Sequence, residues 1–197
     1  CYCIVHYTYI KLNGEKKITM HILKARRFEL SDDLHSRNRR SQVGTRLYEV
    51  MAEMMFESGD FRRSLFSALI DARQVYGKNF AILEDTKRVR MSYKSLITKT
   101  WVLGSALSKL TRPNEAVGVF LPTSNAAIVT FFALQAYQRT PAMLNYSMGA
   151  NAIISTIDTA EIKRIITSEQ FIKQGKLEGV IEKLAAHGVE VVYLEQL

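Results

Sequence analysis

The stretch from Val117 to Gly149 constrains the fold of this chain more than any other part of its sequence. It opens with the apolar run VGVFL at 117–121, which is short and rich in β-branched residues, as is typical of a strand buried on both faces. A turn-forming segment follows, then a nearly apolar run from Ala126 to Tyr137 that predicts a helix, and then a second short strand at 141–144. A strand, a helix and a strand of this length form a βαβ crossover, which is the unit of a parallel sheet. The chain is therefore predicted to be an α/β protein.

The same stretch also permits a membrane interpretation, because no charged residue occurs between Ala116 and Gln138 and that length could cross a bilayer. A spanning helix would carry Pro122, Asn125 and Gln135 through the hydrocarbon, and the helix expected from Ala126 is by itself too short to cross. We therefore favour a strand–turn–helix over insertion of residues 116–138 in a bilayer. In this fold, Phe131 and Leu134 are expected to face the sheet.

The part before this stretch predicts two hairpins and three helices. Residues 1–12 and 17–23 are β-prone and flank Asn13-Gly14, which is a strong hairpin signal, and a polar connector without clear period is expected over 24–40. Apolar spacing predicts helices over 41–57, over 64–76 and from Ser92 to residue 110, with a short hairpin formed by 80–83 and 88–91. The packed side of the helix over 64–76 is predicted to hold Leu65, Ala68, Leu69, Ala72 and Tyr76.

The part after this stretch predicts two more strands. Residues 150–157 suit a short helix, 164–167 and 189–194 suit strands, and the capping-box spacing of Thr167 and Gln170 predicts one helix through Ala186. The predicted fold is a partial doubly wound, largely parallel sheet with flanking helices, preceded by a small β-hairpin and helix segment. Gly104 lies inside a predicted helix, where it costs about 1 kcal/mol relative to Ala, so we expect close packing against a neighbour there.

Composition adds that the chain is globular, with 47% hydrophobic and 23% charged residues. The net charge of +8 is concentrated near the N-terminus, which is compatible with an anionic membrane surface, with nucleic acid or with a solvated face. Cys1 and Cys3 are too close for an ordinary disulfide and have no second ligand pair for zinc, which favours a reducing compartment.

Motifs of known catalytic sites are missing from the sequence. It contains no G-x-G-x-x-G, G-x-x-x-x-G-K-[ST], G-x-S-x-G or H-E-x-x-H, and none of the four histidines has an acidic residue five positions later. Glu84 and Asp85 are adjacent acids at a strand end, where a turn is a more common role than a metal site. We therefore predict no catalytic, cofactor-binding or metal-binding residue in this chain.

Several runs of sequence nevertheless resemble one family, the bacterial bifunctional 2-acylglycerophosphoethanolamine acyltransferase / acyl-[acyl-carrier-protein] synthetases. The runs are MMFES (54–58), SLFSALIDAR (64–73), ILED (82–85), SYKSLI (92–97), VLG (102–104), VGVFLPTS (117–124), FFALQAYQRTPAMLNYSMG (131–149), AEIKRIITSEQFI (160–172) and VVYLE (191–195). The resemblance covers nearly all of the chain, and the run at 131–149 is its most specific part.

The resemblance implies a domain organisation. Residues 1–40 resemble the C-terminal tail of a glycerophospholipid acyltransferase domain, 41–63 a connecting helix, and 64–197 the N-terminal part of an adenylate-forming, AMP-binding ligase domain. It also implies two reactions for a longer parent protein: ATP- and magnesium-dependent activation of a fatty acid onto acyl-carrier protein, and transfer of the acyl group to a lysophospholipid. The family's H-x-x-x-x-D pair, phosphate loop and lid lysine are absent here, so the chain is expected to be a fragment that is inactive alone.

The resemblance also suggests a location, which is cytoplasmic and peripheral at the inner face of the bacterial plasma membrane. The basic residues expected to contact an anionic membrane there are Lys24, Arg26, Arg27, Arg37, Arg39 and Arg40. Nucleic acid is not expected as a partner. The alternative function is that of a non-catalytic α/β module that binds a membrane surface or a partner chain.

Overall fold

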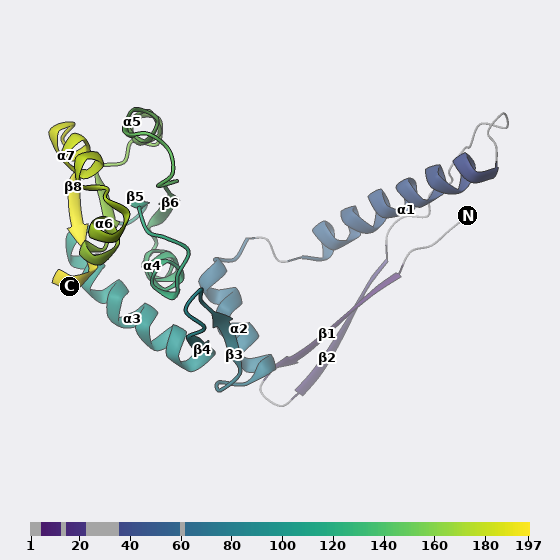
Figure 1. Ribbon diagram of the computed structural model, residues 1–197. Coiled ribbons are helices and arrows are strands. Elements are labelled where there is room, and N and C mark those ends of the chain that lie inside the picture. The colour runs from purple at the N-terminus through teal and green to yellow at the C-terminus, as the bar shows by residue number, and fades with distance from the viewer. Residues whose placement is uncertain (1–4, 13–14, 23–35, 60–61) are drawn as a thin grey trace. The chain divides into compact units, whose positions relative to one another are not determined.

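The computed structural model describes residues 5–12, 15–22, 36–59 and 62–197, and it divides into two compact units, Cys1–Arg63 and Ser64–Leu197 (Figure 1). Each unit is described by itself. The second unit begins at Ser64, the residue at which the ligase-like part is predicted to start. The assignment of these parts to an acyltransferase tail, a connecting helix and a ligase domain stays a prediction.

The first unit contains a hairpin and a long helix. Strands β1 (Val5–Leu12) and β2 (Glu15–Ile22) pair antiparallel, as predicted, with Val5 opposite Ile22 and Leu12 opposite Glu15. Helix α1 spans Ser36–Ser58, so the prediction of an irregular connector up to residue 40 is wrong for its last five residues. Arginine is a good helix former, and the three arginines in this segment extend the helix by more than a turn. Residues 13–14 and 23–35 lie outside the described part of the chain.

The second unit is built on a four-stranded parallel sheet. Its strands are β5 (Ala116–Val119), β6 (Thr140–Met143), β7 (Arg164–Thr167) and β8 (Glu190–Tyr193), in the spatial order β6-β5-β7-β8. All three pairings are parallel. The crossovers are α4 (Asn125–Ala136), α5 (Ala150–Thr159), and the pair α6 (Glu169–Gly175) and α7 (Glu178–Ala186). The predicted parallel α/β fold is confirmed.

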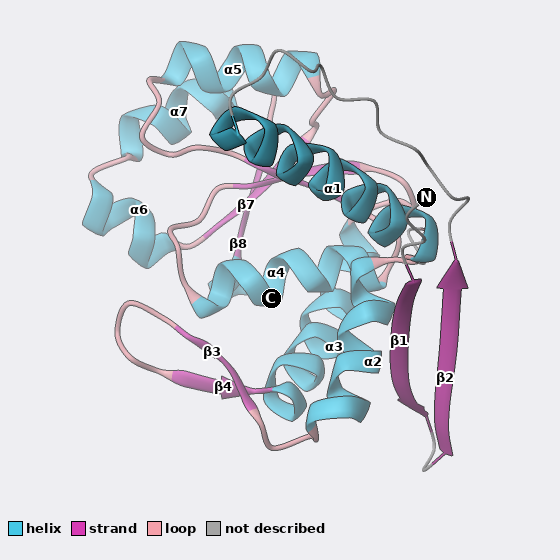
Figure 2. Cartoon of the chain, turned by 90° about the vertical axis from the view of Figure 1, so that its right-hand side faces the viewer, coloured by secondary structure: helices cyan, strands magenta, loops and turns pink. Residues whose placement is uncertain are grey.

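Helices cover both faces of this sheet (Figure 2). On one face, Val117 and Val119 of β5 pack with α4 and with α3 (Tyr93–Leu110). On the other face, Phe120 and Ile165 pack with α5, α6 and α7. Gly118 lies between Val117 and Val119 in β5. A Cβ there would stand 2.7 Å from Ile165 Cγ2, so a larger residue would have to displace the buried side chain of Ile165. The sheet is therefore buried on both faces, as the apolar run predicted.

Helices α3 and α4 approach each other closely at a glycine. A Cβ at Gly104 would lie 2.5 Å from the ring of Tyr137 and 3.0 Å from the carbonyl oxygen of Ala133. Because the second of these atoms is backbone, the space cannot be opened by a side-chain rotation alone. The close packing predicted for Gly104 is confirmed, and it explains a residue that is unfavourable inside a helix.

A buried arginine joins the C-terminal ends of the same two helices. Arg139 is 8% exposed, and its Nε donates to Thr111 Oγ1 at 2.8 Å while one Nη donates to the carbonyl of Ser108 at 3.1 Å. The guanidinium also donates to the carbonyls of Thr111 and Tyr137. Helix ends leave carbonyl groups without partners, and a cation there complements the helix dipole. Arg139 therefore caps α3 and α4 together.

A smaller layer lies beside α3. Helix α2 (Leu65–Tyr76), capped by Ser64, and the hairpin of β3 (Ala81–Glu84) and β4 (Arg90–Ser92) occupy the predicted positions. The predicted packed side of α2 is partly wrong, because Phe66 and Leu69 are its buried residues whereas Leu65 and Tyr76 are exposed. Since apolar residues occur nearly all round this helix, its sequence pattern does not define one face.

The helix predicted to run from Thr167 to Ala186 is two helices. Lys176 ends α6 in the left-handed conformation (φ +50°), and the amide of Leu177 donates to the carbonyl of Ile172 at 3.0 Å before α7 begins. The N-cap of α6 is Ser168, whereas Thr167 still belongs to β7 and donates its hydroxyl to the carbonyl of Phe120. The prediction is therefore wrong in two ways: the N-cap is Ser168 and not Thr167, and the segment forms two helices and not one.

Residues 116–138 form β5, a turn and α4, as favoured over a spanning helix. Within the described ranges, no helix is both long and apolar enough to cross a membrane. Leu134 is fully buried against the sheet, as predicted. Phe131 is only half-buried, and its ring contacts that of Phe132 rather than the sheet core. The predicted position of Phe131 is wrong because α4 faces the sheet with the side that carries Ala133 and Leu134, and Phe131 lies at the border of that side.

We predict that Leu134→Ala lowers the free energy of unfolding of the second unit by about 2–5 kcal/mol, because it leaves a cavity under the sheet. Phe131→Ala should cost less than half as much, because its side chain already contacts solvent. Urea unfolding followed by the fluorescence of Trp101, the one tryptophan of the chain, measures both. Equal losses for the two variants would contradict the described orientation of α4.

We predict that Arg139→Met costs at least about 3 kcal/mol of stability, because the buried carbonyls lose their donors and each loss costs roughly 1–3 kcal/mol. The matched control is Arg112→Met, which removes an exposed arginine from a neighbouring loop and should change stability by less than about 0.5 kcal/mol. The same urea titration applies. A loss below 1 kcal/mol for the Arg139 variant would mean that water replaces the guanidinium at both helix ends.

Candidate functional site

The topology of the sheet indicates where a ligand site would lie. In open parallel sheets, ligands bind beyond the carboxyl ends of the strands at the point where the strand order reverses. Here the chain leaves β5 toward β6 on one side and leaves β7 toward β8 on the other, so the reversal lies between β5 and β7. The candidate site is therefore the carboxyl edge formed by the loops 120–124 and 167–169.

The polar side chains at this edge hold the local structure together. The hydroxyl of Ser124 caps α4 by accepting from the amide of Ala127 at 3.3 Å, and it donates to the carbonyl of Pro122. After β6, Asn145 Oδ1 accepts from both the amide and the hydroxyl of Ser147. Each of these groups does the work of a turn or a cap. Among the described side chains of this edge, one hydroxyl is hydrogen-bonded to a carboxylate, that of Ser168 to Glu195, and this pair caps a helix.

A carboxylate from the end of the chain occupies the N-terminus of α6. Glu195 accepts from the hydroxyl of Ser168 at 2.6 Å, from the amide of Glu169 at 3.0 Å and from the amide of Gln170 at 3.3 Å. Burial raises the pKa of this carboxyl, but the hydrogen bonds from Ser168 and the two amides outweigh it and lower the pKa below its ordinary value. The edge thus supplies its own anion at this helix.

An apolar cavity of about 460 Å³ opens beside this edge. It is bordered by α3, the first turn of α4, Met91 of β4 and the C-terminal residues Leu194 and Leu197. Of the described residues that line it, only Lys99 has a charged side chain, and the side-chain amide of Asn125 already donates to Asp85 and to the carbonyl of Val89. The cavity can accept an apolar group, but its lining offers no general base.

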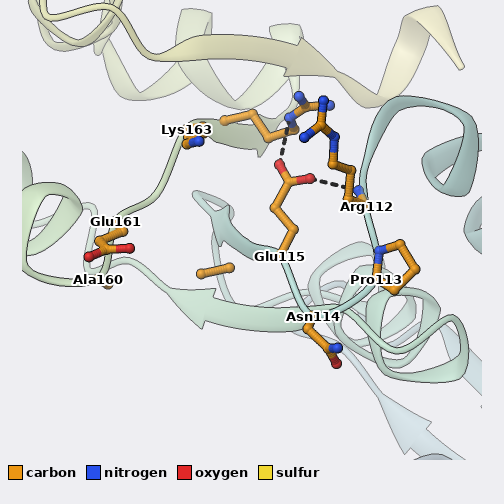
Figure 3. A pocket seen from close by; sticks show the side chains of 9 residues that line it. Arg112, Pro113, Asn114, Glu115, Ala160, Glu161 and Lys163 are labelled. Carbon is orange, nitrogen blue, oxygen red and sulfur yellow. Dashed lines mark hydrogen bonds and ion pairs between the residues drawn. The ribbon is translucent and has the colours of Figure 1, made fainter.

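A second cavity, of about 430 Å³, lies at the opposite, amino edge of the sheet (Figure 3). Glu115 projects into it, accepts from the amide of Arg112 at 2.7 Å and pairs with Arg164 at 2.9 Å, and Arg164 also pairs with Glu190 at 3.4 Å. Lys163 and Glu161 line its rim. The half-buried ion pairs tie the loop before β5 to the start of β7, which is a structural role at the edge where parallel sheets do not bind ligands.

The adjacent acids Glu84 and Asp85 form a turn, in agreement with their sequence interpretation. Asp85 Oδ1 accepts from the amides of Lys87 and Val89 at 2.9 Å each, and Glu84 pairs with Arg90 at 2.8 Å. No group of three or more His, Cys, Asp or Glu side chains that could hold a metal ion occurs in the part of the chain that the structure describes.

Comparison with solved structures identifies the fold of the second unit. The N-terminal domain of FACL13 from Mycobacterium tuberculosis, bound to an inhibitor, superposes with a TM-score of 0.58 at 16% identity, over 68% of this chain and 34% of that one. The anthranilate CoA ligase AuaEII with anthranoyl-AMP gives 0.57 at 16% identity, over 67% and 26%. O-Succinylbenzoate CoA synthetase from Bacillus subtilis with ATP and magnesium gives 0.53 at 10% identity, over 68% and 33%. No protein-family model matches the chain.

These likenesses define a class of fold. The mixed α/β structure with its four-stranded parallel sheet is part of the fold of adenylate-forming ligase domains. At these identities the comparison establishes the fold alone. The chain spans about a third of the length of the matched structures, or less.

The residues with the most specific local roles were not singled out from the sequence. Glu195 lies 26 residues from the amide of Glu169 that it caps, and Arg139 lies 28 residues from Thr111. The spacing of Thr167 and Gln170 predicted a helix N-terminus near this place, but nothing in the sequence indicated that Glu195 would cap it. Tertiary contacts of this kind leave no periodic pattern in a single sequence.

We predict that Glu195→Gln destabilises the second unit in a pH-dependent way. Because the folded-state pKa is lowered, the contribution of the carboxylate is present above the ordinary glutamate pKa and is lost as pH falls through the folded-state pKa. The stability difference between wild type and variant should therefore be largest near pH 7 and shrink below about pH 4. Urea titrations at several pH values measure it, and a difference that is constant from pH 7 to pH 3 would contradict an anionic cap.

Proposed function

We propose that residues 64–197 are the first part of the larger N-terminal domain of an ATP-dependent ligase that activates an acyl acid as its adenylate. The observation that carries this proposal is the fold, since the matched structures include a CoA ligase with a bound acyl-AMP and a CoA synthetase with ATP and magnesium. In such a protein this part contributes the first strands of a doubly wound sheet and the carboxyl edge toward which the rest of the domain is completed.

The finer proposal concerns the parent protein and rests on sequence resemblance. We propose a phospholipid-remodelling enzyme that activates a fatty acid, transfers it to acyl-carrier protein and then acylates a lysophospholipid. The run at 131–149, the most specific part of the resemblance, covers the end of α4, strand β6 and the loop beyond it. The non-catalytic alternative is an α/β module that binds a membrane or a partner chain. It is supported by the use of Ser124, Asn145 and Ser168 at the carboxyl edge as turn and cap residues.

ATP and magnesium are implied for the parent, but the residues present here do not fit them. The phosphate loop ending in Lys-Gly is missing from the sequence, and the N-terminus of α6 is already filled by Glu195. The described side chains also include no group that could hold a metal ion. We therefore propose that this chain is inactive alone.

The N-terminal basic residues support a proposal for location. We propose that Lys24, Arg26, Arg27, Arg37, Arg39 and Arg40 keep the parent at the inner, anionic face of the bacterial plasma membrane. Arg37, Arg39 and Arg40 lie on the first turns of α1, where Arg39 and Arg40 are exposed. Each basic residue near an anionic leaflet contributes about 1 kcal/mol, and salt screens this attraction.

Fatty-acid-dependent exchange between ATP and pyrophosphate tests the proposed activity. Residues 1–197 should give no exchange above background, whereas a polypeptide extended through a phosphate loop and a lysine-bearing lid should give exchange that depends on the fatty acid. A known CoA ligase assayed in parallel is the positive control. Exchange by residues 1–197 at a rate comparable to that control would overturn the proposal that the chain is an inactive part of a ligase.

A further inference from the structure

Two exposed aromatic rings lie side by side, one at the end of α2 and one in the turn that follows it. Tyr76 is 61% exposed and Phe80 is 53% exposed, and their ring centroids lie 5.6 Å apart. Val75, in the same turn of α2, is also more than half exposed. Single exposed apolar residues are normal on a protein surface, but adjacent aromatic rings mark an interaction surface.

This exposure is built into the fold and does not arise from a loose loop. Gly77 ends α2 in a left-handed conformation (φ +92°), and its amide donates to the carbonyl of Arg73 at 2.9 Å. Beyond it, the amide of Tyr93 donates to the carbonyl of Phe80 at 3.1 Å, and the amide of Lys94 to that of Lys78 at 2.9 Å. Tyr76 also stacks parallel to the buried ring of Tyr93. The rings are therefore held outward by a hydrogen-bonded turn.

The same hydrogen bonds place two lysines beside the rings. We call Tyr76, Phe80, Lys78 and Lys94 the aromatic–basic patch. Lys78 and Lys94 are exposed, and neither forms an ion pair among the described residues. The surrounding sequence strengthens this charge, because residues 72–114 contain nine Lys or Arg but only Glu84 and Asp85 as acids. With Asp71, which lies just before this window on α2, residues 71–114 hold nine basic and three acidic residues, so this segment carries a net positive charge.

We propose that the aromatic–basic patch docks the second unit onto an anionic phospholipid surface. Aromatic rings favour the headgroup level of a bilayer, and lysines beside them extend their ammonium groups to lipid phosphates while their stems cover apolar surface. The charge complementarity favours an anionic membrane over a protein partner. The patch includes none of the basic residues of the N-terminal segment, and the proposal does not depend on whether the parent is a ligase.

Fluorescence of a tryptophan placed in the patch tests insertion directly. The whole chain is used with Trp101→Phe and Phe80→Trp, so that the one tryptophan reports on the patch; Trp101 contacts the rings of Phe66 and Tyr137, which a phenylalanine can replace. Circular dichroism checks the fold. With vesicles of phosphatidylcholine and phosphatidylglycerol we expect a blue shift and quenching by brominated acyl chains, and little change with phosphatidylcholine alone.

Vesicle co-sedimentation of variants separates the patch from other basic surfaces. Tyr76→Ser with Phe80→Ser, and Lys78→Gln with Lys94→Gln, should each weaken partitioning roughly tenfold or more. The matched control, Lys163→Gln with Lys183→Gln, removes two exposed lysines elsewhere on this unit and should stay within about twofold of wild type. Replacing Arg37, Arg39 and Arg40 by Gln should reduce binding without abolishing the blue shift of the Phe80→Trp protein.

Three results would overturn the proposal. The first is co-sedimentation of the Phe80→Trp protein without a blue shift, which would assign binding to another region. The second is equal partitioning of the patch variants and the control. The third is no binding to vesicles of any composition at low salt, in which case the face would be one for a protein partner.

Discussion

The contact between α3 and α4 is the interaction on which the second unit depends. These helices precede and follow β5, and together they cover one face of the sheet. Gly104 lets their backbones approach, and Arg139 supplies hydrogen-bond donors to the carbonyls at both C-terminal ends. Arg139 has no carboxylate partner among the described residues, and its buried guanidinium is tolerated because helix ends present the partial negative charge that it needs.

The sheet of the second unit extends on both sides of β5. Strand β5, between α3 and α4 in sequence, lies inside the sheet with β6 and β7 parallel to it, and a parallel sheet needs a crossover connection for each further strand. The carboxyl ends of β5 and β7 then meet at the reversal of strand order. At that edge the side chains of Ser124, Ser168 and Glu195 form hydrogen bonds that cap the N-termini of α4 and α6.

The sequence predicted the type of nearly every element in the second unit because local signals agree with the fold. The apolar run at 117–121, Ser92 at the start of α3 and Gly104 within it are local signals whose interpretation does not depend on distant residues. The errors lie where distant residues decide. The break between α6 and α7 is set by a left-handed Lys176, and the buried side of α2 is set by its neighbours. The extension of α1 back to Ser36 was missed because a charged segment without apolar period gives no helix signal.

For the site, the sequence lacks known catalytic motifs, and it did not predict the roles of Glu195 and Arg139. Both are charged residues whose partners are more than 20 residues away, and charge alone does not tell a cap from a solvated side chain. The fold, in turn, resembles that of adenylate-forming ligase domains, a likeness that the catalytic motifs alone did not indicate. We propose that the chain is part of the scaffold of an adenylate-forming domain, and the phosphate loop and lid lysine of that family are missing from its sequence.

Binding of ATP to the isolated chain tests this account most directly. Equilibrium dialysis of residues 1–197 against labelled ATP with magnesium, beside a complete CoA ligase, measures it without requiring turnover. The account predicts no saturable binding by the chain at ATP concentrations that saturate the ligase. Saturable binding at one site per chain would contradict it, because it would mean that the carboxyl edge already holds a nucleotide site.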